Sequence, residues 1–407
     1  MLIRDLIHSS RGLRKNFAFS LTAISTIAMG IGASTAIFSV VNAVLLRPLP
    51  YPNPARLVLI ESDLKARGVK DFPFSPPDFA DIRAAANLLD DVSGIFTGRV
   101  PVPGDNAESE QVPSAFCIPN FLRLMGARIV RGRDLAVADA APVPPGAPPA
   151  VSMVVIRYEY WQRRFGGVAN IIGRSFDFGF GKAQVVGVLE PGFKLLFPPK
   201  SGIDREPEIW TAPRFNYATF DRNLVSLNLI GRMKPGVTVG RLQAQMNGIA
   251  NDLQSRFPIK RTSGLTFRVE PMQDDVVASV RPAIRTLMGA VIFLLLIACA
   301  NVANLLLVRS SSRSREMAVR AAVGAGRWDL ARHMLCESLL IALAGGVLGV
   351  VLARAGITFL TSLAPERLPR LGDIAIDTTT LLFTAAATIA ATTIFGIFPR
   401  SGRRGRT

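Results

Sequence analysis

Side chains that could carry out catalysis are few in this chain, and they are not spaced as a catalytic set. Neither of the two histidines, His8 and His333, has a partner at metal-ligand spacing, so we predict no bound metal. The string nearest to a phosphate-binding loop, 179–183, lacks the first glycine at the required offset and the hydroxyl that would meet magnesium. The Gly-x-Ser-x-Gly pattern of esterases is also missing. We therefore predict no catalytic residue, no cofactor and no ATP hydrolysis by this chain.

One charged residue, Arg354, interrupts an otherwise uncharged run, 338–364. A charge inside a membrane-spanning segment is a candidate functional residue. Arginine can also extend its long side chain to the membrane surface and keep its charge in water. The sequence leaves both interpretations of Arg354 open.

Four long runs with little or no charge are the elements that organise the chain. Each can supply the about 20 apolar helical residues that cross a bilayer. A polar segment rich in proline and glycine lies between the first run and the other three, and it is long enough to fold as a domain. We predict an α-helical membrane domain of four transmembrane helices, with an α/β domain inserted between the first and the second. The runs are 16–46, 286–308, 338–364 and 378–399.

The net charge of +17 is concentrated beside these runs. Positive residues mark the cytoplasmic side of short loops, and all three basic clusters fall on one side if each run spans once. We therefore predict cytoplasmic N- and C-termini and an outer location for the inserted domain. We expect the clusters to touch anionic lipid rather than nucleic acid. They comprise Arg4, Arg11, Arg14, Lys15, Arg309, Arg313, Arg315, Arg320, Arg327, Arg332, Arg400, Arg403, Arg404 and Arg406.

The segment between the first two runs shows the mixed patterns of an α/β domain. Apolar runs closed by turn residues indicate strands, and apolar spacing near 3.6 indicates helices. Two of the turns contain Pro-Gly, and one helix is followed by Gly166-Gly167, a typical C-cap. The predicted strands are 56–61, 151–156, 184–189, 227–233 and 265–269; the predicted helices are 75–89, 158–165 and 239–253; and 136–150 is a predicted loop.

The loop between the second and third runs is predicted to form a short surface helix, a turn at Gly324-Ala325-Gly326 and a second helix. This arrangement would offer a basic and apolar surface to a soluble partner. Glu316 and Arg320 are four residues apart, so they can pair with each other or bridge to that partner. Close helix packing is predicted at small residues of the first and third runs, namely Gly30, Gly32, Gly345 and Gly349.

Several longer motifs carry a resemblance to a known family. Residues 14–17 and 27–50 resemble the first span of MacB and FtsX-like ABC transporter permeases, and they look closest to the duplicated orphan permeases of acidobacteria. Residues 160–167, 172–174 and 231–238 are similar to the periplasmic core of this family. Residues 315–325, with Glu337-Ser338, are similar to its cytoplasmic coupling loop.

The resemblance implies a set of domains on this chain. The periplasmic core would consist of two subdomains. One would lie near the membrane, and the other would be inserted in the sequence of the first. The expected parts are a cytoplasmic amphipathic helix 1–16, a first span 17–46, a core domain 47–283 (membrane-proximal 51–113 and 225–275, inserted 114–224), a second span 284–308, a coupling loop 309–334, a third span 335–362, a periplasmic loop 363–377, a fourth span 378–398 and a tail 399–407.

The resemblance also implies a function and partners. It implies a non-catalytic permease subunit in the bacterial inner membrane, driven by a separate ABC ATPase through Arg315, Glu316, Arg320, Gly324, Ala325 and Gly326. Such a subunit would form a homodimer or pair with a related permease, and Gly30 and Gly32 would permit close helix contact across that dimer. It would transmit mechanical work to periplasmic clients, for example in efflux with an adaptor or outer-membrane channel. A second hypothesis is a membrane-tethered module that activates a periplasmic partner such as a cell-wall hydrolase.

The chain departs from the duplicated permeases at two points. No internal repeat is found, so it corresponds to one half-unit. The end, 398–407, does not follow the family pattern, and we interpret it as truncated or frameshifted.

Overall fold

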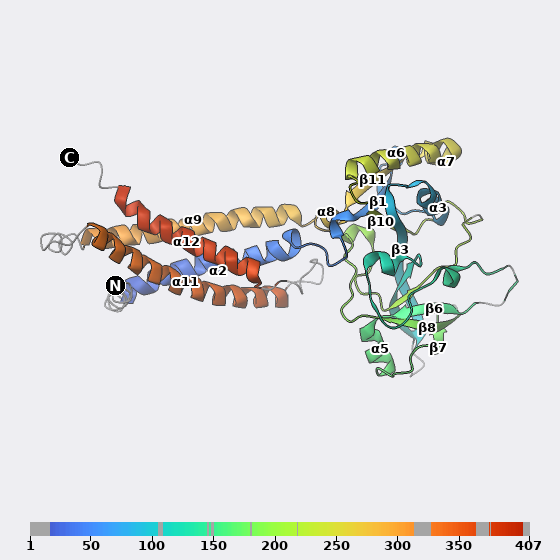
Figure 1. Cartoon of the computed structure of the whole chain (residues 1–407), viewed down its shortest axis with the longest axis horizontal. Helices are drawn as coiled ribbons and strands as arrows, with labels where there is room; N and C mark the ends of the chain where they lie inside the picture. Colours follow the sequence, from blue (N-terminus) through green and yellow to red (C-terminus); the bar gives the residue numbers. More distant parts are fainter. Residues whose placement is uncertain are drawn as a thin grey trace. The chain divides into compact units, whose positions relative to one another are not determined.

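The computed structural model describes residues 17–104, 109–144, 146–147, 150–179, 181–217, 219–312, 327–363, 374 and 376–401. The chain divides into two compact units, of which one comprises residues 1–47 and 280–407 and the other residues 48–279 (Figure 1).

The described part of the first unit contains long apolar helices, of which α2 (Phe17–Val41) packs against the other three. Figure 1 shows these helices side by side. Within the described part of the chain, Phe17–Leu46 and Leu339–Phe359 are long and apolar enough to cross a membrane, and Thr378–Ile389 is a shorter apolar segment. The number of four crossings stays a prediction. The elements are α2 (Phe17–Val41), the π-helical turn η1 (Asn42–Leu46), α9 (Arg281–Ser312), α11 (Arg327–Leu363) and α12 (Thr378–Ser401).

The second unit is built on one mixed sheet, in which the neighbouring strands follow the order β11-β1-β10-β3-β4-β9-β6-β8-β5. The strands β2 and β7 pair with β1 and β8 beside this path. Pairing is antiparallel except for β4 with β9 and β6 with β8. The strands are β1 (Leu57–Leu64), β2 (Val69–Phe72), β3 (Leu89–Pro103), β4 (Ser109–Cys117), β5 (Ile129–Gly132), β6 (Ser152–Ile156), β7 (Ser175–Phe178), β8 (Gly181–Leu189), β9 (Ile209–Thr211), β10 (Asn228–Met233) and β11 (Leu265–Pro271).

Short and medium helices cover this sheet. The predicted helix 75–89 begins as expected, because the Ser75 hydroxyl caps it by accepting a hydrogen bond from the Asp78 amide. Its predicted end is wrong: the helix stops at Ala85, and Leu89 instead pairs with Met233 as the first residue of β3. The helical segments are η2 (Pro54–Arg56), η3 (Lys65–Arg67), α3 (Pro76–Ala85), α4 (Phe121–Met125), η4 (Val137–Ala140), α5 (Tyr158–Phe165), η5 (Pro199–Ser201), α6 (Val239–Arg256), α7 (Pro258–Thr262) and α8 (Met272–Val276).

Two apolar cores share the sheet. The first core gathers buried side chains of β1, β10 and β11 with the apolar faces of α3 and α6. The second gathers those of β6 and β8 with α5. The strand β3 belongs to both, since Val92 lies in the first core and Val100 and Val102 lie in the second. The predicted boundary between subdomains, at residue 113, falls inside β4.

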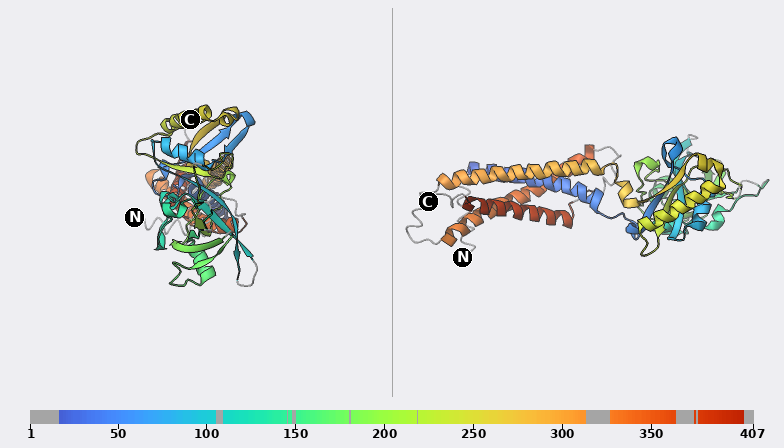
Figure 2. Two further views of the ribbon diagram at one scale, coloured as in Figure 1. Left: turned by 90° about the vertical axis from the view of Figure 1, so that its right-hand side faces the viewer. Right: turned by 90° about the horizontal axis from the view of Figure 1, so that it is seen from above.

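The outer edge of β11 is covered by α6, which lies beside it in both Figure 1 and Figure 2. The Gln243 side chain donates to the Phe267 carbonyl and accepts from the Val269 amide, both at 2.8 Å. Gln254 donates to the Leu265 carbonyl at 2.6 Å. These side chains take the place of a further strand, so the edge does not present free backbone groups to another chain there.

Candidate functional site

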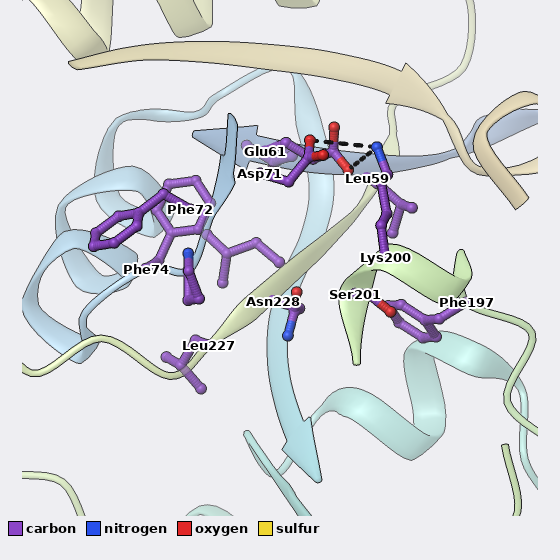
Figure 3. Close-up of a pocket in the computed structure, with 13 residues that line it drawn as sticks. Leu59, Glu61, Asp71, Phe72, Phe74, Phe197, Lys200, Ser201, Leu227 and Asn228 are labelled. Atoms are coloured by element: carbon purple, nitrogen blue, oxygen red, sulfur yellow. Dashed lines mark hydrogen bonds and ion pairs between the residues drawn. The ribbon is translucent and has the colours of Figure 1, made fainter. Parts of the chain in front are cut away.

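A charged cluster connects η5 to the first strands of the sheet. The Lys200 Nζ atom lies 2.8 Å from a carboxylate oxygen of Glu61 in β1, 3.3 Å from one of Asp71 in β2 and 3.0 Å from one of Asp275 in α8. Figure 3 shows the Lys200 side chain extending from η5 toward Glu61 and Asp71. One cation on η5 thus joins the neighbouring strands β1 and β2 to α8, which lies about two hundred residues later in the sequence.

Arg268 in β11 supplies a second cation to the same cluster. It pairs with Glu61 and Asp71, and its Nη1 atom lies 2.6 Å from Asp63 Oδ2. Asp71 has a left-handed backbone, with φ at +54°, and its amide donates to Asp63 Oδ1 at 3.1 Å. A non-glycine residue rarely adopts this conformation unless its surroundings hold it there. The ion pairs of Asp71 provide that support.

The cluster holds more carboxylates than cations, and this shapes its titration. Burial raises the pKa of Glu61 to about 7, with help from the neighbouring charge of Asp275 and against the opposing effect of Lys200. Burial also acts to raise the pKa of Asp71, but hydrogen bonding within the cluster and the positive charge of Lys200 outweigh it and lower that pKa. Burial alone would lower the pKa of Lys200, yet its bonds to Glu61 and Asp275 raise it. The raised pKa places the titration of Glu61 near neutral pH.

A small cavity of about 20 Å³ lies between this cluster and the apolar side chains of Phe72, Phe74 and Phe197 (Figure 3). A volume of this size holds about one water molecule and no organic substrate. The cavity beside Glu61 and Lys200 therefore leaves no room for an organic substrate, and the contacts of these two residues are structural ones that join η5, β1, β2 and α8.

The raised pKa of Glu61 predicts a pH dependence of stability. A carboxyl whose folded-state pKa lies above its unfolded value near 4.5 stabilises the fold at low pH, and this contribution is lost as the pH rises toward about 7. We expect the free energy of unfolding of the natural chain to fall by about 1–3 kcal/mol relative to Glu61→Gln between pH 5 and pH 8. Denaturant titrations of the full chain in detergent at several pH values measure this difference.

Glu270→Gln is the matched control, because Glu270 also pairs with Arg268, at 3.2 Å, but is more exposed than Glu61. If Glu61→Gln and Glu270→Gln follow the same pH profile, the assignment to Glu61 is wrong.

A second charged cluster holds the segment before β10 against α3 and α7. Asp78, whose side chain is only 4% exposed, pairs with Lys260 of α7 and lies 2.8 Å from Arg222. Arg222 also pairs with Asp81 at 2.8 Å, and its guanidinium lies 4.0 Å from the centre of the Phe257 ring. A buried carboxylate with two cations is stable only while these partners are present.

The predicted coupling residues Arg315, Glu316, Arg320, Gly324, Ala325 and Gly326 lie outside the described residues, as do His8 and the predicted amphipathic helix 1–16. Arg354 lies on an exposed part of α11.

The structure brings two of the predicted packing glycines together within one chain. A Cβ atom added to Gly32 in α2 would lie 3.0 Å from the Gly349 carbonyl oxygen in α11. One added to Gly345 would lie 2.6 Å from Ile27 Cγ2 and 2.8 Å from Ile27 Cβ. Gly30 is buried in α2. Small residues thus allow α2 and α11 to approach closely, and packing across a dimer stays a prediction.

The sequence interpretation missed polar contacts that join α2 and η1 to α12 and to the residue before α12. The Thr35 and Thr384 hydroxyls lie 3.0 Å apart, and Asn42 donates to Asp377 Oδ2 at 2.8 Å. Asp377 also accepts a hydrogen bond from the Thr380 amide at 2.9 Å and so caps α12. This hydrogen bond lowers the pKa of Asp377. The spacing of Thr380, Thr384 and Thr388 by four residues was the available signal, since it places three hydroxyls on one helix face.

The architecture defines a class of protein: a helical unit with candidate membrane spans that carries an α/β domain inserted after its first helix. Two family models cover most of the chain. The one described as MacB-like periplasmic core domain matches residues 20–249, and the one described as FtsX-like permease C-terminal matches residues 288–406. The chain belongs to the MacB/FtsX-like family of ABC transporter permeases.

Similar curated proteins include two named macrolide export ATP-binding/permease protein MacB. The one from Shewanella sp. (strain W3-18-1) is 28% identical over 244 residues, which are 58% of this chain and 34% of the relative. The one from Shewanella oneidensis is 25% identical over 283 residues, 67% of this chain and 40% of the relative. The chain thus spans between a third and two fifths of the length of these relatives.

Among solved structures, the periplasmic region of MacB from Actinobacillus actinomycetemcomitans matches with a TM-score of 0.37 and 13% sequence identity, covering 56% of this chain and 94% of that one.

Proposed function

We propose that this chain is the permease subunit of an ABC transporter in which a separate ATPase moves the coupling loop, 309–334, and the membrane helices pass that motion to the core domain. The observation that carries this proposal is the insertion of the core domain into the helical unit. The chain joins the two units at residues 47–48 and again at residues 279–280. A displacement of α2, which leads into the domain, relative to α9, which follows the domain, therefore acts on both ends of the domain.

The packing of the helical unit supports such a relay. Helix α2, which leads into the core domain, contacts α9, which follows it, and also contacts α11 and α12. The close approach at Gly32 and Gly349 and the polar contacts with α12 tie α2 to its neighbours. A helix held in this way moves together with its bundle rather than independently of it.

The work done on the core domain would serve the export or extraction of periplasmic substrates. The core domain would face the periplasm, the termini and coupling loop would face the cytoplasm, and the subunit would act as a dimer in the inner membrane. A periplasmic adaptor or outer-membrane channel would complete an efflux route. The family membership supports this assignment.

The coupling role predicts that Glu316→Ala combined with Arg320→Ala will lower recovery of the ATPase at least fivefold. The reason is that these residues would form the charged face that the ATPase contacts. Crosslinking in native membranes identifies the P-loop ATPase bound to the natural chain, and its recovery with the variant is then measured at equal membrane insertion. Arg403→Ala with Arg404→Ala is the control for lost basic charge. Unchanged recovery with Glu316→Ala/Arg320→Ala would reject the coupling role.

A further inference from the structure

One short segment of the second unit contacts both of its ends. This crossing segment, Lys194–Ser201, follows β8 and lies far in sequence from either end. Its apolar side chains Leu195 and Leu196 are 0% and 5% exposed, so it is anchored in the domain. The consecutive Pro198 and Pro199 restrict its backbone. It is therefore a stiff connection rather than a loose surface loop.

A tyrosine near the N-terminal end of the domain binds the crossing segment. Tyr51 lies ten residues after the end of α2 and is 5% exposed. Its hydroxyl donates to the Lys194 carbonyl at 3.1 Å and accepts from the Leu196 amide at 2.8 Å. One phenol thus satisfies two backbone groups of the crossing segment, and its removal would leave a buried amide without this partner.

A lysine near the end of the crossing segment, Lys200, binds the C-terminal end of the domain. Lys200 pairs with Asp275 in α8, the helix that leads into α9. Glu61 of β1 binds the same ammonium group, so this contact is attached to the sheet. The two ends of the domain also touch directly, because the Leu49 amide donates to the Gln273 side chain at 3.0 Å.

We propose that the crossing segment is the junction that couples the two membrane-connected ends of the core domain to each other and to the sheet, with Tyr51 and Lys200 as its positioning residues. This inference deepens the proposed function and rests on it for its role in transport. The junction itself is a property of the domain and can be tested without the ATPase.

Hydrogen–deuterium exchange of the full chain in lipid nanodiscs tests the coupling. Lys200→Met removes the bond to Asp275, and its effect could reach the N-terminal end through the crossing segment or through the direct bond of the Leu49 amide to Gln273. All variants are therefore compared in a Gln273→Ala background, which lacks that direct bond. The junction predicts that peptides covering residues 49–56 will also exchange at least threefold faster. Tyr51→Phe is expected to produce the reciprocal effect at residues 272–277. The double variant should increase exchange less than the sum of the two single variants, because both act through one segment.

Rescue and control variants separate this coupling from general damage to the fold. Lys200→Arg keeps the positive charge and is expected to restore most of the protection at both ends. Lys182→Met changes an exposed lysine that pairs with the exposed Asp177 at 3.2 Å, and should leave both ends unchanged. If Lys200→Met leaves residues 49–56 unchanged, or if Tyr51→Phe leaves residues 272–277 unchanged, the junction is rejected.

The outcome is independent of the recruitment experiment on Glu316 and Arg320. Loss of recruitment without coupled exchange would reject the junction and retain the permease assignment. Coupled exchange without any effect on recruitment would retain the junction and reject the coupling role of Glu316 and Arg320.

Discussion

Replacing Gly345 with leucine is expected to force α11 away from α2 and to destabilise the helical unit. A Cβ atom at this position would meet the Ile27 Cβ atom at 2.8 Å. Rotation of the Ile27 side chain cannot relieve this contact, because Cβ is fixed to the backbone. The helices must separate, and overpacking of this kind costs about 1–3 kcal/mol. The Gly32–Gly349 contact along the same pair of helices would be lost with it.

Gly356 provides a control on the same helix. Among the described residues no heavy atom lies within 4 Å of a Cβ added there, so Gly356→Leu is expected to insert the same side chain with far less crowding. Thermal denaturation of the two variants in the same detergent should give a clearly lower midpoint for Gly345→Leu only. Equal midpoints would show that the approach of α2 to α11 does not depend on this glycine.

Asp78→Ala is expected to be the most damaging single change in the second unit. It would leave Lys260, which is 8% exposed, without the carboxylate that pairs with it, and would remove one of the two acids that hold Arg222. Breaking one partner of a buried ion pair costs about 3–5 kcal/mol because the other charge remains buried. Denaturant unfolding of the full chain, followed by tryptophan fluorescence, measures this loss.

Two further variants serve as a control and a partial rescue for the unfolding measurement on Asp78→Ala. Asp252→Ala removes a carboxylate from an exposed pair with Arg256 and should cost about 0–1 kcal/mol. Adding Lys260→Met to Asp78→Ala removes the unpaired charge, so part of the lost stability should return. A cost for Asp78→Ala no larger than that for Asp252→Ala would contradict a structural role for the buried pair.

Elements with a strong local signal were predicted from the sequence. The helix 158–165 is confirmed as α5, and Gly166 at its end has φ at +61°, as a C-cap requires. The strand prediction 151–156 is confirmed as β6, shorter by one residue. The helix 239–253 is confirmed as α6, which continues to Arg256. In each case apolar periodicity and a turn or cap residue agree.

The strands β3 and β4 were missed because their signal is not local. Their sequence includes Gly98, Pro101, Pro103 and Pro113 and lacks a clear alternation, so it is typical of a loop. They form strands because β3 pairs with β10 and β4 pairs with β3. The charged cluster at Lys200 was missed for the same reason: Glu61, Lys200 and Asp275 come together only through the tertiary fold.

The strand β3, which belongs to both cores, has a consequence for how the core domain can change shape. Domains that swing freely do so about flexible linkers, whereas here a continuous ladder of backbone hydrogen bonds runs from one half to the other through β10, β3 and β4. Any rearrangement driven from the helices would have to bend or twist this ladder elastically. A domain built in this way would deform elastically and recover its shape, and would not open and close about a hinge.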